Sequence, residues 1–170
     1  MTERTIVTEQ RTLRWIRICI GILMFGLLVS GITAFPLRAE VSLGSELLHS
    51  TPLAGWFPDA TSWVDRVAAA LVDVDGRYPF ISYGTDWLAF AHIVLAVVFI
   101  GPLIDPVRNI WVIQFGVIAC VGIIPLALIA GSARGIPLGW QLIDISFGVL
   151  GAIPLLIAWR LTRRLERSPR

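Results

Sequence analysis

The sequence predicts an all-α integral membrane protein, a bundle of four transmembrane helices. Hydrophobic residues make up 56% of the 170 residues and charged residues only 15%, with a mean hydropathy of +0.77. Four apolar runs approach or reach about 20 residues, the helical length that crosses roughly 30 Å of hydrocarbon. Because helices satisfy their own backbone hydrogen bonds in lipid, we expect these runs to form one membrane domain over residues 1–170.

The four expected spans have ends marked by aromatic and turn residues. They are residues 15–35, 86–103, 110–131 and 139–159. Tryptophan favours the membrane interface, and the runs begin or end near Trp15, Trp87, Trp111, Trp140 and Trp159. In the turn after the second span, Asp105 is expected to cap a helix whose first residue is Pro106.

The arginines predict the orientation of the chain. All fourteen basic residues are arginine. Those near the termini are Arg4, Arg11, Arg14, Arg17, Arg160, Arg163, Arg164, Arg167 and Arg170. The first loop, residues 36–84, is acidic instead. Positive loops and ends stay in the cytoplasm, so we expect both termini inside and this loop outside. A cleaved signal peptide is disfavoured, because the first apolar run exceeds a typical h-region.

The first loop is expected to contain short amphipathic helices. In residues 59–75 an apolar stripe lies opposite charged positions. The stripe consists of Trp63, Val67, Leu71 and Val74, and the opposite positions are Asp65, Arg66 and Asp73. Asp59 or Thr61 is the expected cap, residues 39–50 form a second short helical turn, and His49 is a solvated loop residue. The segment "RYPFISYG" is expected to be extended. The helices either roof the bundle, which we favour, or lie on the outer leaflet.

Polar residues of the expected spans gather near their outer ends. His92 lies six residues beyond Asp86, about 9 Å deeper along a helix, and Asp144 reaches a similar depth. Ionisable residues within spans face the protein interior and find partners. We therefore expect a polar pocket formed by Asp86, His92, Arg134 and Asp144, with His92 paired to Asp144 and Asp86 to Arg134.

Several chemistries remain open for this pocket, and others are disfavoured. His92 either fixes helix packing or handles a proton or ligand. No metal site is expected, because one intramembrane histidine with scattered carboxylates lacks ligand spacing. Cys19 and Cys120 form no C-x-x-C pair and are expected to pack in the core. No nucleotide-binding or hydrolase motif occurs.

One segment carries a resemblance. "GTDWLAFAH", followed by "GPLIDPVRN", is similar to a stretch in a group of small uncharacterised bacterial membrane proteins with four spans. The likeness covers roughly residues 78–157. It implies a bacterial inner membrane and attaches no activity, cofactor or partner.

These observations favour a binding role over a catalytic one. We expect a small ligand, an ion or a partner protein at the outward-facing pocket, with a membrane protein or a second copy as partner and no nucleic acid. The alternatives are a proton-coupled transporter or channel formed by oligomers, or a membrane redox or lipid-acting enzyme that uses His92 and Asp144. No cofactor is indicated.

Overall fold

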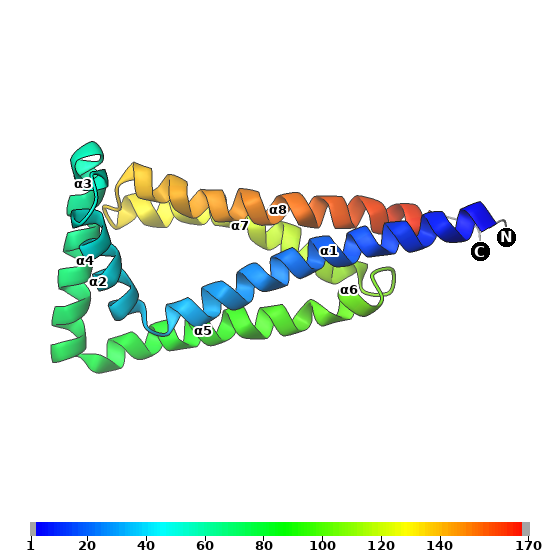
Figure 1. The fold of residues 1–170 in the computed structure, drawn as a ribbon. Helices are drawn as coiled ribbons and strands as arrows, with labels where there is room; N and C mark the ends of the chain where they lie inside the picture. The colour runs from blue at the N-terminus through cyan, green and yellow to red at the C-terminus, as the bar shows by residue number, and fades with distance from the viewer. Residues whose placement is uncertain (1–2, 168–170) are drawn as a thin grey trace. The chain divides into compact units, whose positions relative to one another are not determined.

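The computed structural model describes residues 3–167, with side chains from residue 7 onward. The described range is helical and contains no strand, which confirms the all-α class. The orienting residue Arg170 and the side chain of Arg4 lie outside the described part. The helices, labelled in Figure 1, are α1 (Glu3–Ala34), α2 (Leu37–His49), α3 (Leu53–Trp56), α4 (Pro58–Arg77), α5 (Pro79–Val98), α6 (Ile100–Ile104), α7 (Ile110–Ala133) and α8 (Leu138–Arg167).

Four segments are long and apolar enough to cross a bilayer, so the chain is a multi-pass membrane protein. They are Val7–Ala34, Pro79–Ile104, Ile110–Ala133 and Leu138–Arg167. The third matches the expected span closely. The second begins at Pro79 rather than at residue 86, because "PFISYG" is helical and not extended as expected. Asp86 therefore lies about 10 Å along the helix from its first residue, not at the helix start.

The chain divides into two compact units. One consists of Met1–Leu27 and Leu95–Arg170, and the other of Leu28–Val94. Helices α1 and α5 pass from one unit into the other, since both boundaries fall inside these helices. We call Leu28–Val94 the hairpin unit and the remainder the core unit.

The core unit is held together by close helix contacts. Ile16, Ile20, Ile113 and Leu155, which come from α1, α7 and α8, are completely buried in one apolar cluster. At Gly148 the approach of α8 to α7 is so close that an added Cβ would lie 2.6 Å from the carbonyl oxygen of Cys120. Without a hydrophobic effect between lipid-exposed helices, such tight packing is what stabilises them.

Glycines of the spans differ in how closely they approach a neighbouring helix. Gly116 packs against Phe99 and Leu155, whereas a Cβ on Gly26 would meet nothing within 4 Å. The close approach of α1 is instead at Gly31, where a Cβ would lie 2.9 Å from the carbonyl oxygen of Ala89 on α5. Spacing alone could not distinguish which glycine of α1 faces a neighbour.

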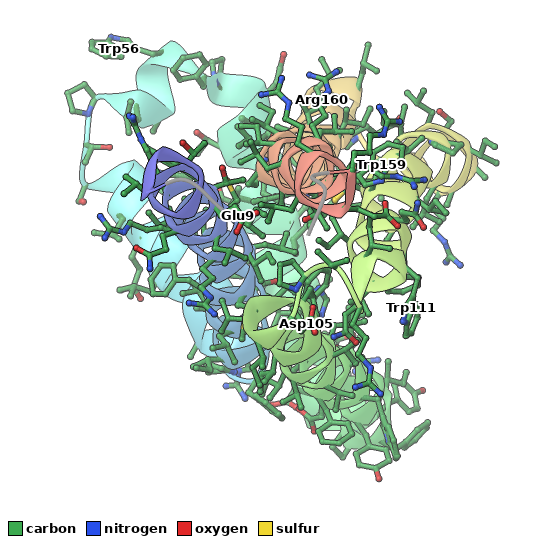
Figure 2. The ribbon with its side chains drawn as sticks, turned by 90° about the vertical axis from the view of Figure 1, so that its right-hand side faces the viewer. Glu9, Trp56, Asp105, Trp111, Trp159 and Arg160 are labelled. Atoms are coloured by element: carbon green, nitrogen blue, oxygen red, sulfur yellow. The ribbon has the colours of Figure 1, made fainter. Side chains whose placement is uncertain are left out.

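The turn between α6 and α7 is stabilised by polar side chains. Helix α7 begins at Ile110, so Pro106 is not its first residue as expected. Asp105 caps the preceding turn, where its Oδ1 accepts the Arg108 N–H at 3.0 Å. The Asn109 amide donates to the carbonyl oxygens of Gly101 and Asp105, at 3.1 and 2.9 Å. Figure 2 shows Asp105 beside this turn and the exposed Trp111 pointing away from α7.

The hairpin unit contains the amphipathic helices expected in the first loop. Helices α2 and α4 lie alongside one another, joined by the short α3. The stripe that begins with Trp63 is half-buried, while Arg66 and Asp73 are exposed. The expected caps are wrong: Phe57 occupies the N-cap of α4, and the Thr61 hydroxyl donates to the Phe57 carbonyl oxygen at 3.0 Å.

Candidate functional site

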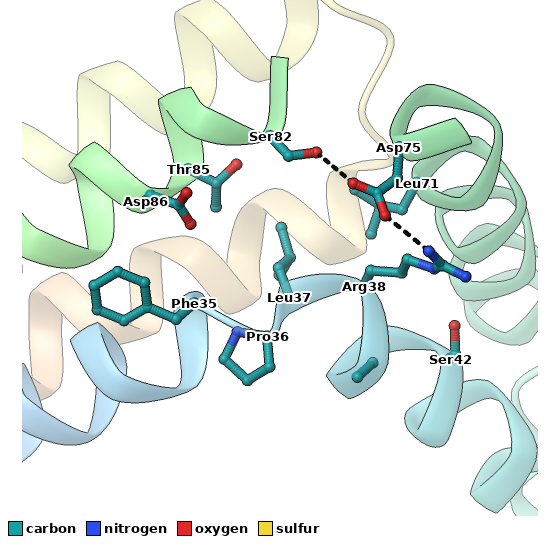
Figure 3. A pocket seen from close by; sticks show the side chains of 11 residues that line it. Phe35, Pro36, Leu37, Arg38, Ser42, Leu71, Asp75, Ser82, Thr85 and Asp86 are labelled. Carbon is teal, nitrogen blue, oxygen red and sulfur yellow. Dashed lines mark hydrogen bonds and ion pairs between the residues drawn. The ribbon is translucent and has the colours of Figure 1, made fainter. Parts of the chain in front are cut away.

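A cavity of about 500 Å³ lies within the hairpin unit. Its wall combines the end of α1 with residues of α2, α4 and α5. The lining consists of Phe35, Pro36, Leu37, Arg38, Ala39, Ser42, Leu71, Asp75, Ser82, Thr85 and Asp86, most of which are drawn and labelled in Figure 3. This volume lies within the range of about 300–1,000 Å³ that is usual for small-molecule sites.

Two prolines create the corners that bring these residues together. Pro36 lacks a backbone N–H and interrupts the helix after Ala34, so the chain turns into α2 and places Arg38 in its first turn. Pro79 disfavours helical geometry at Tyr78, whose φ and ψ are −138° and 60°. Helix α4 thus ends at Arg77, which leaves Asp75 in its last turn, and α5 begins at Pro79 with Asp86 about two turns further on.

One end of the cavity carries a neutralised pair of charges. The Arg38 guanidinium lies 2.7 Å from an oxygen of Asp75, with 56% and 34% of the two side chains exposed. The Ser82 hydroxyl donates to the other oxygen of Asp75 at 3.4 Å. Both interactions are drawn in Figure 3. Asp75 thereby joins α2 to the first turn of α5 and defines this part of the wall.

Asp86 is the unpaired charge of the cavity. Its half-buried carboxylate forms no hydrogen bond or ion pair with any side chain or backbone group described in residues 7–167. In Figure 3, Asp86 and Phe35 lie toward one end of the cavity, Arg38 and Asp75 lie toward the other, and Leu37 lies between them. The site therefore presents one uncompensated negative charge beside an apolar and aromatic wall.

His92 has a defined hydrogen bond within its own helix. Its Nδ1 lies 2.8 Å from the Leu88 carbonyl oxygen, which can only accept, so Nδ1 carries the hydrogen. In the neutral ring, Nε2 is then left as an acceptor. The backbone around His92 packs against Gly31 of α1, since a Cβ at residue 31 would lie 3.3 Å from the His92 Cβ. His92 does not line the cavity.

The other two expected pocket residues belong to the core unit. Arg134 is exposed just after α7, and Asp144 is half-buried in α8. Near them, the buried Gln141 amide donates to the Ile136 carbonyl oxygen at 2.8 Å and closes the turn between the two helices. The expected pairs of Asp144 with His92 and of Arg134 with Asp86 each join residues of different units, and both pairs stay predictions.

A second polar group joins α2 to α4. The Ser45 hydroxyl donates to one oxygen of Asp65 at 2.6 Å, and His49 Nε2 lies 3.0 Å from the other. The His49 side chain is exposed, as expected, but the residue is the last one of α2 rather than part of a loop, and it contacts Asp65. The hydrogen bond from Ser45, followed by that from His49, lowers the pKa of Asp65. Asp65 lies between Ser45 and His49 and contacts both of them. Nucleophilic catalysis by a serine requires the histidine to contact the serine hydroxyl, so we assign this group a structural role in joining α2 to α4.

Sequence reasoning missed most of the cavity wall. Arg38, Asp75 and Ser82 were absent from the expected site, although Asp75 lies one helical turn after Leu71 on the same face of α4. That spacing was the available signal. The partner of Asp75 lies 37 residues away in the chain, a relation that periodicity within one helix does not report.

Among the described residues, no group of three or more histidine, cysteine, aspartate or glutamate side chains is arranged to hold a metal ion. No family model, curated protein or solved structure matches the chain.

Proposed function

We propose that this chain is a ligand-binding membrane protein whose cavity in the hairpin unit takes a small molecule. The observation that carries the proposal is Asp86, a charged side chain that faces a cavity without a partner while the other charges on the wall neutralise each other. Unpaired carboxylates in part-buried sites are costly, so such a group favours a ligand that compensates it. The lining combines six polar or charged residues with five apolar ones, so it offers both hydrogen-bonding groups and apolar surface to a small molecule.

We further propose that the protein lies in a bacterial cytoplasmic membrane, with both termini inside and the cavity facing outward. The arginine-rich ends and the acidic first loop support this orientation. The resemblance of residues 78–157 to small bacterial membrane proteins supports the setting. The cavity then lies where α1 ends and α5 begins, at the level of the outer membrane surface, where both soluble ligands and lipid headgroups have access.

The binding role is tested by filling the cavity. Leu71→Trp adds a large side chain to the wall, and Val72→Trp adds the same side chain at an exposed neighbouring position of α4. A set of amines, carboxylates and neutral compounds is screened against the full chain in detergent by thermal stabilisation. We expect at least one compound to stabilise the wild-type protein and the Val72→Trp variant but not Leu71→Trp. Stabilisation that never depends on Leu71 would refute the binding role.

Orientation is tested by cysteine labelling. Ser62→Cys places an exposed thiol on α4, and Gln10→Cys places one near the start of α1, while Cys19 and Cys120 are buried. In intact cells, a membrane-impermeant maleimide should label the Ser62→Cys variant. The Gln10→Cys variant should be labelled only after the membrane has been permeabilised. The reverse pattern would contradict the proposed topology.

A further inference from the structure

The charges of the cavity point to the class of ligand it takes. Arg38 and Asp75 form a 2.7 Å ion pair, so their charges cancel. Asp86 then leaves the lining with one net negative charge. Electrostatic complementarity favours a ligand with a single positive charge. A positively charged N–H group that donates to a carboxylate forms a strong, charge-assisted hydrogen bond.

The remaining groups around Asp86 favour an organic cation over a metal ion. Calcium requires six to eight oxygen ligands, and magnesium about six in near-ideal octahedral geometry. Asp86 and the adjacent Thr85 hydroxyl supply few such oxygens, and the described residues contain no cluster of metal-ligating side chains. Phe35 offers an aromatic ring to the same cavity, and ring faces attract cations. Leu37 and Leu71 add apolar surface that suits the hydrocarbon part of an organic ligand.

We propose that the cavity binds the primary ammonium group of an organic molecule at Asp86, with the carbon body of that molecule against Phe35, Leu37 and Leu71. This inference rests on the proposed ligand-binding function and specifies its ligand. The ammonium donates to the Asp86 carboxylate and to the Thr85 hydroxyl oxygen. Two sources present this group at the ends of the spans: the headgroup of an aminophospholipid and a free amine.

The test uses phenethylammonium as a soluble probe, with 2-phenylethanol as its neutral analogue and phenylpropionate as its anionic analogue. Binding to the full chain in detergent at pH 7 is measured by titration calorimetry. Asp86→Asn removes the charge and keeps the shape. Asp73→Asn is the matched control, because Asp73 pairs with Arg77 at 2.8 Å on α4 and does not line the cavity.

We expect phenethylammonium to bind more tightly than both analogues. Asp86→Asn should weaken it by about 10- to 100-fold, the scale of one charge-assisted hydrogen bond, and Asp73→Asn should leave it unchanged. Equal binding of the three probes, or binding that Asp86→Asn leaves unchanged, would overturn the ammonium assignment. If phenethylammonium binding did not depend on Asp86 but were lost in Leu71→Trp, the proposed binding function would stand without the ammonium assignment. If the binding of no probe or screened compound depended on Leu71, the binding function and the ammonium assignment would both fail.

A lipid experiment distinguishes the two sources. The full chain is placed in nanodiscs of mixed phosphatidylethanolamine and phosphatidylglycerol, and retained lipid is identified by native mass spectrometry. Retention of phosphatidylethanolamine that Asp86→Asn abolishes and phenethylammonium displaces would support the ammonium site with a lipid as its ligand. Phenethylammonium binding without selective lipid retention would support it with a free amine. Preferential retention of phosphatidylglycerol that depends on Asp86 would overturn the assignment.

Discussion

A substitution at Gly148 tests how the core unit is held together. An alanine Cβ there would lie 2.6 Å from the carbonyl oxygen of Cys120 and 3.2 Å from the Cβ of Ile123. Ordinary contacts of a Cβ begin at 3.4 Å, so α7 and α8 would have to separate by roughly 0.8 Å, the difference between 3.4 and 2.6. A helical carbonyl oxygen cannot rotate away from the methyl group. Overpacking of this kind costs about 1–3 kcal/mol.

Gly122 provides the matched control for this substitution. It lies in α7, and a Cβ there would meet nothing within 4 Å. Both changes gain the same helix preference of alanine over glycine, about 0.8–1 kcal/mol, so their difference isolates the steric cost. We expect Gly148→Ala to be less stable than Gly122→Ala by about 1–3 kcal/mol. Reversible unfolding in mixed micelles, followed by circular dichroism, measures this difference. Equal stabilities would show that α7 and α8 are not in the contact described.

Two further predictions concern the turn and the hairpin. Asn109→Ala removes two hydrogen bonds to turn carbonyl oxygens and should lower the free energy of unfolding by about 1–2 kcal/mol in the same micelle assay; an unchanged value would show that this amide does not hold the turn. The pKa of Asp65 is lowered in the folded state, so its stabilisation of the α2–α4 pair is present above about pH 3.9, its unfolded value, and is lost as pH falls through the folded pKa. Hydrogen exchange of the amides of α2 should therefore be faster in Asp65→Asn than in the wild type at pH 7, and this difference should shrink as the pH falls below about 3.9. A difference independent of pH would refute the linkage.

The helix breaks of the hairpin unit explain why the candidate site was only partly predictable. Asp86 is predictable because a carboxylate within an apolar run is unusual in the sequence itself. Arg38 and Asp75 are not predictable in this way, since each belongs to an ordinary amphipathic helix where charges are common. Their importance follows from an ion pair across 37 residues of chain, which exists only because α2 and α4 lie side by side.

The sequence by itself determined the class, the number of spans and the presence of amphipathic helices in the first loop of this protein. Each follows from a local property, either the length of an apolar run or a stripe repeated at the helical period. Only the tertiary structure decided that Asp86 shares a cavity with Phe35, that His49 contacts Asp65, and that Gly31 rather than Gly26 meets α5. These relations depend on where helices break and how they cross, so the physical reason is packing between segments that are distant in the chain.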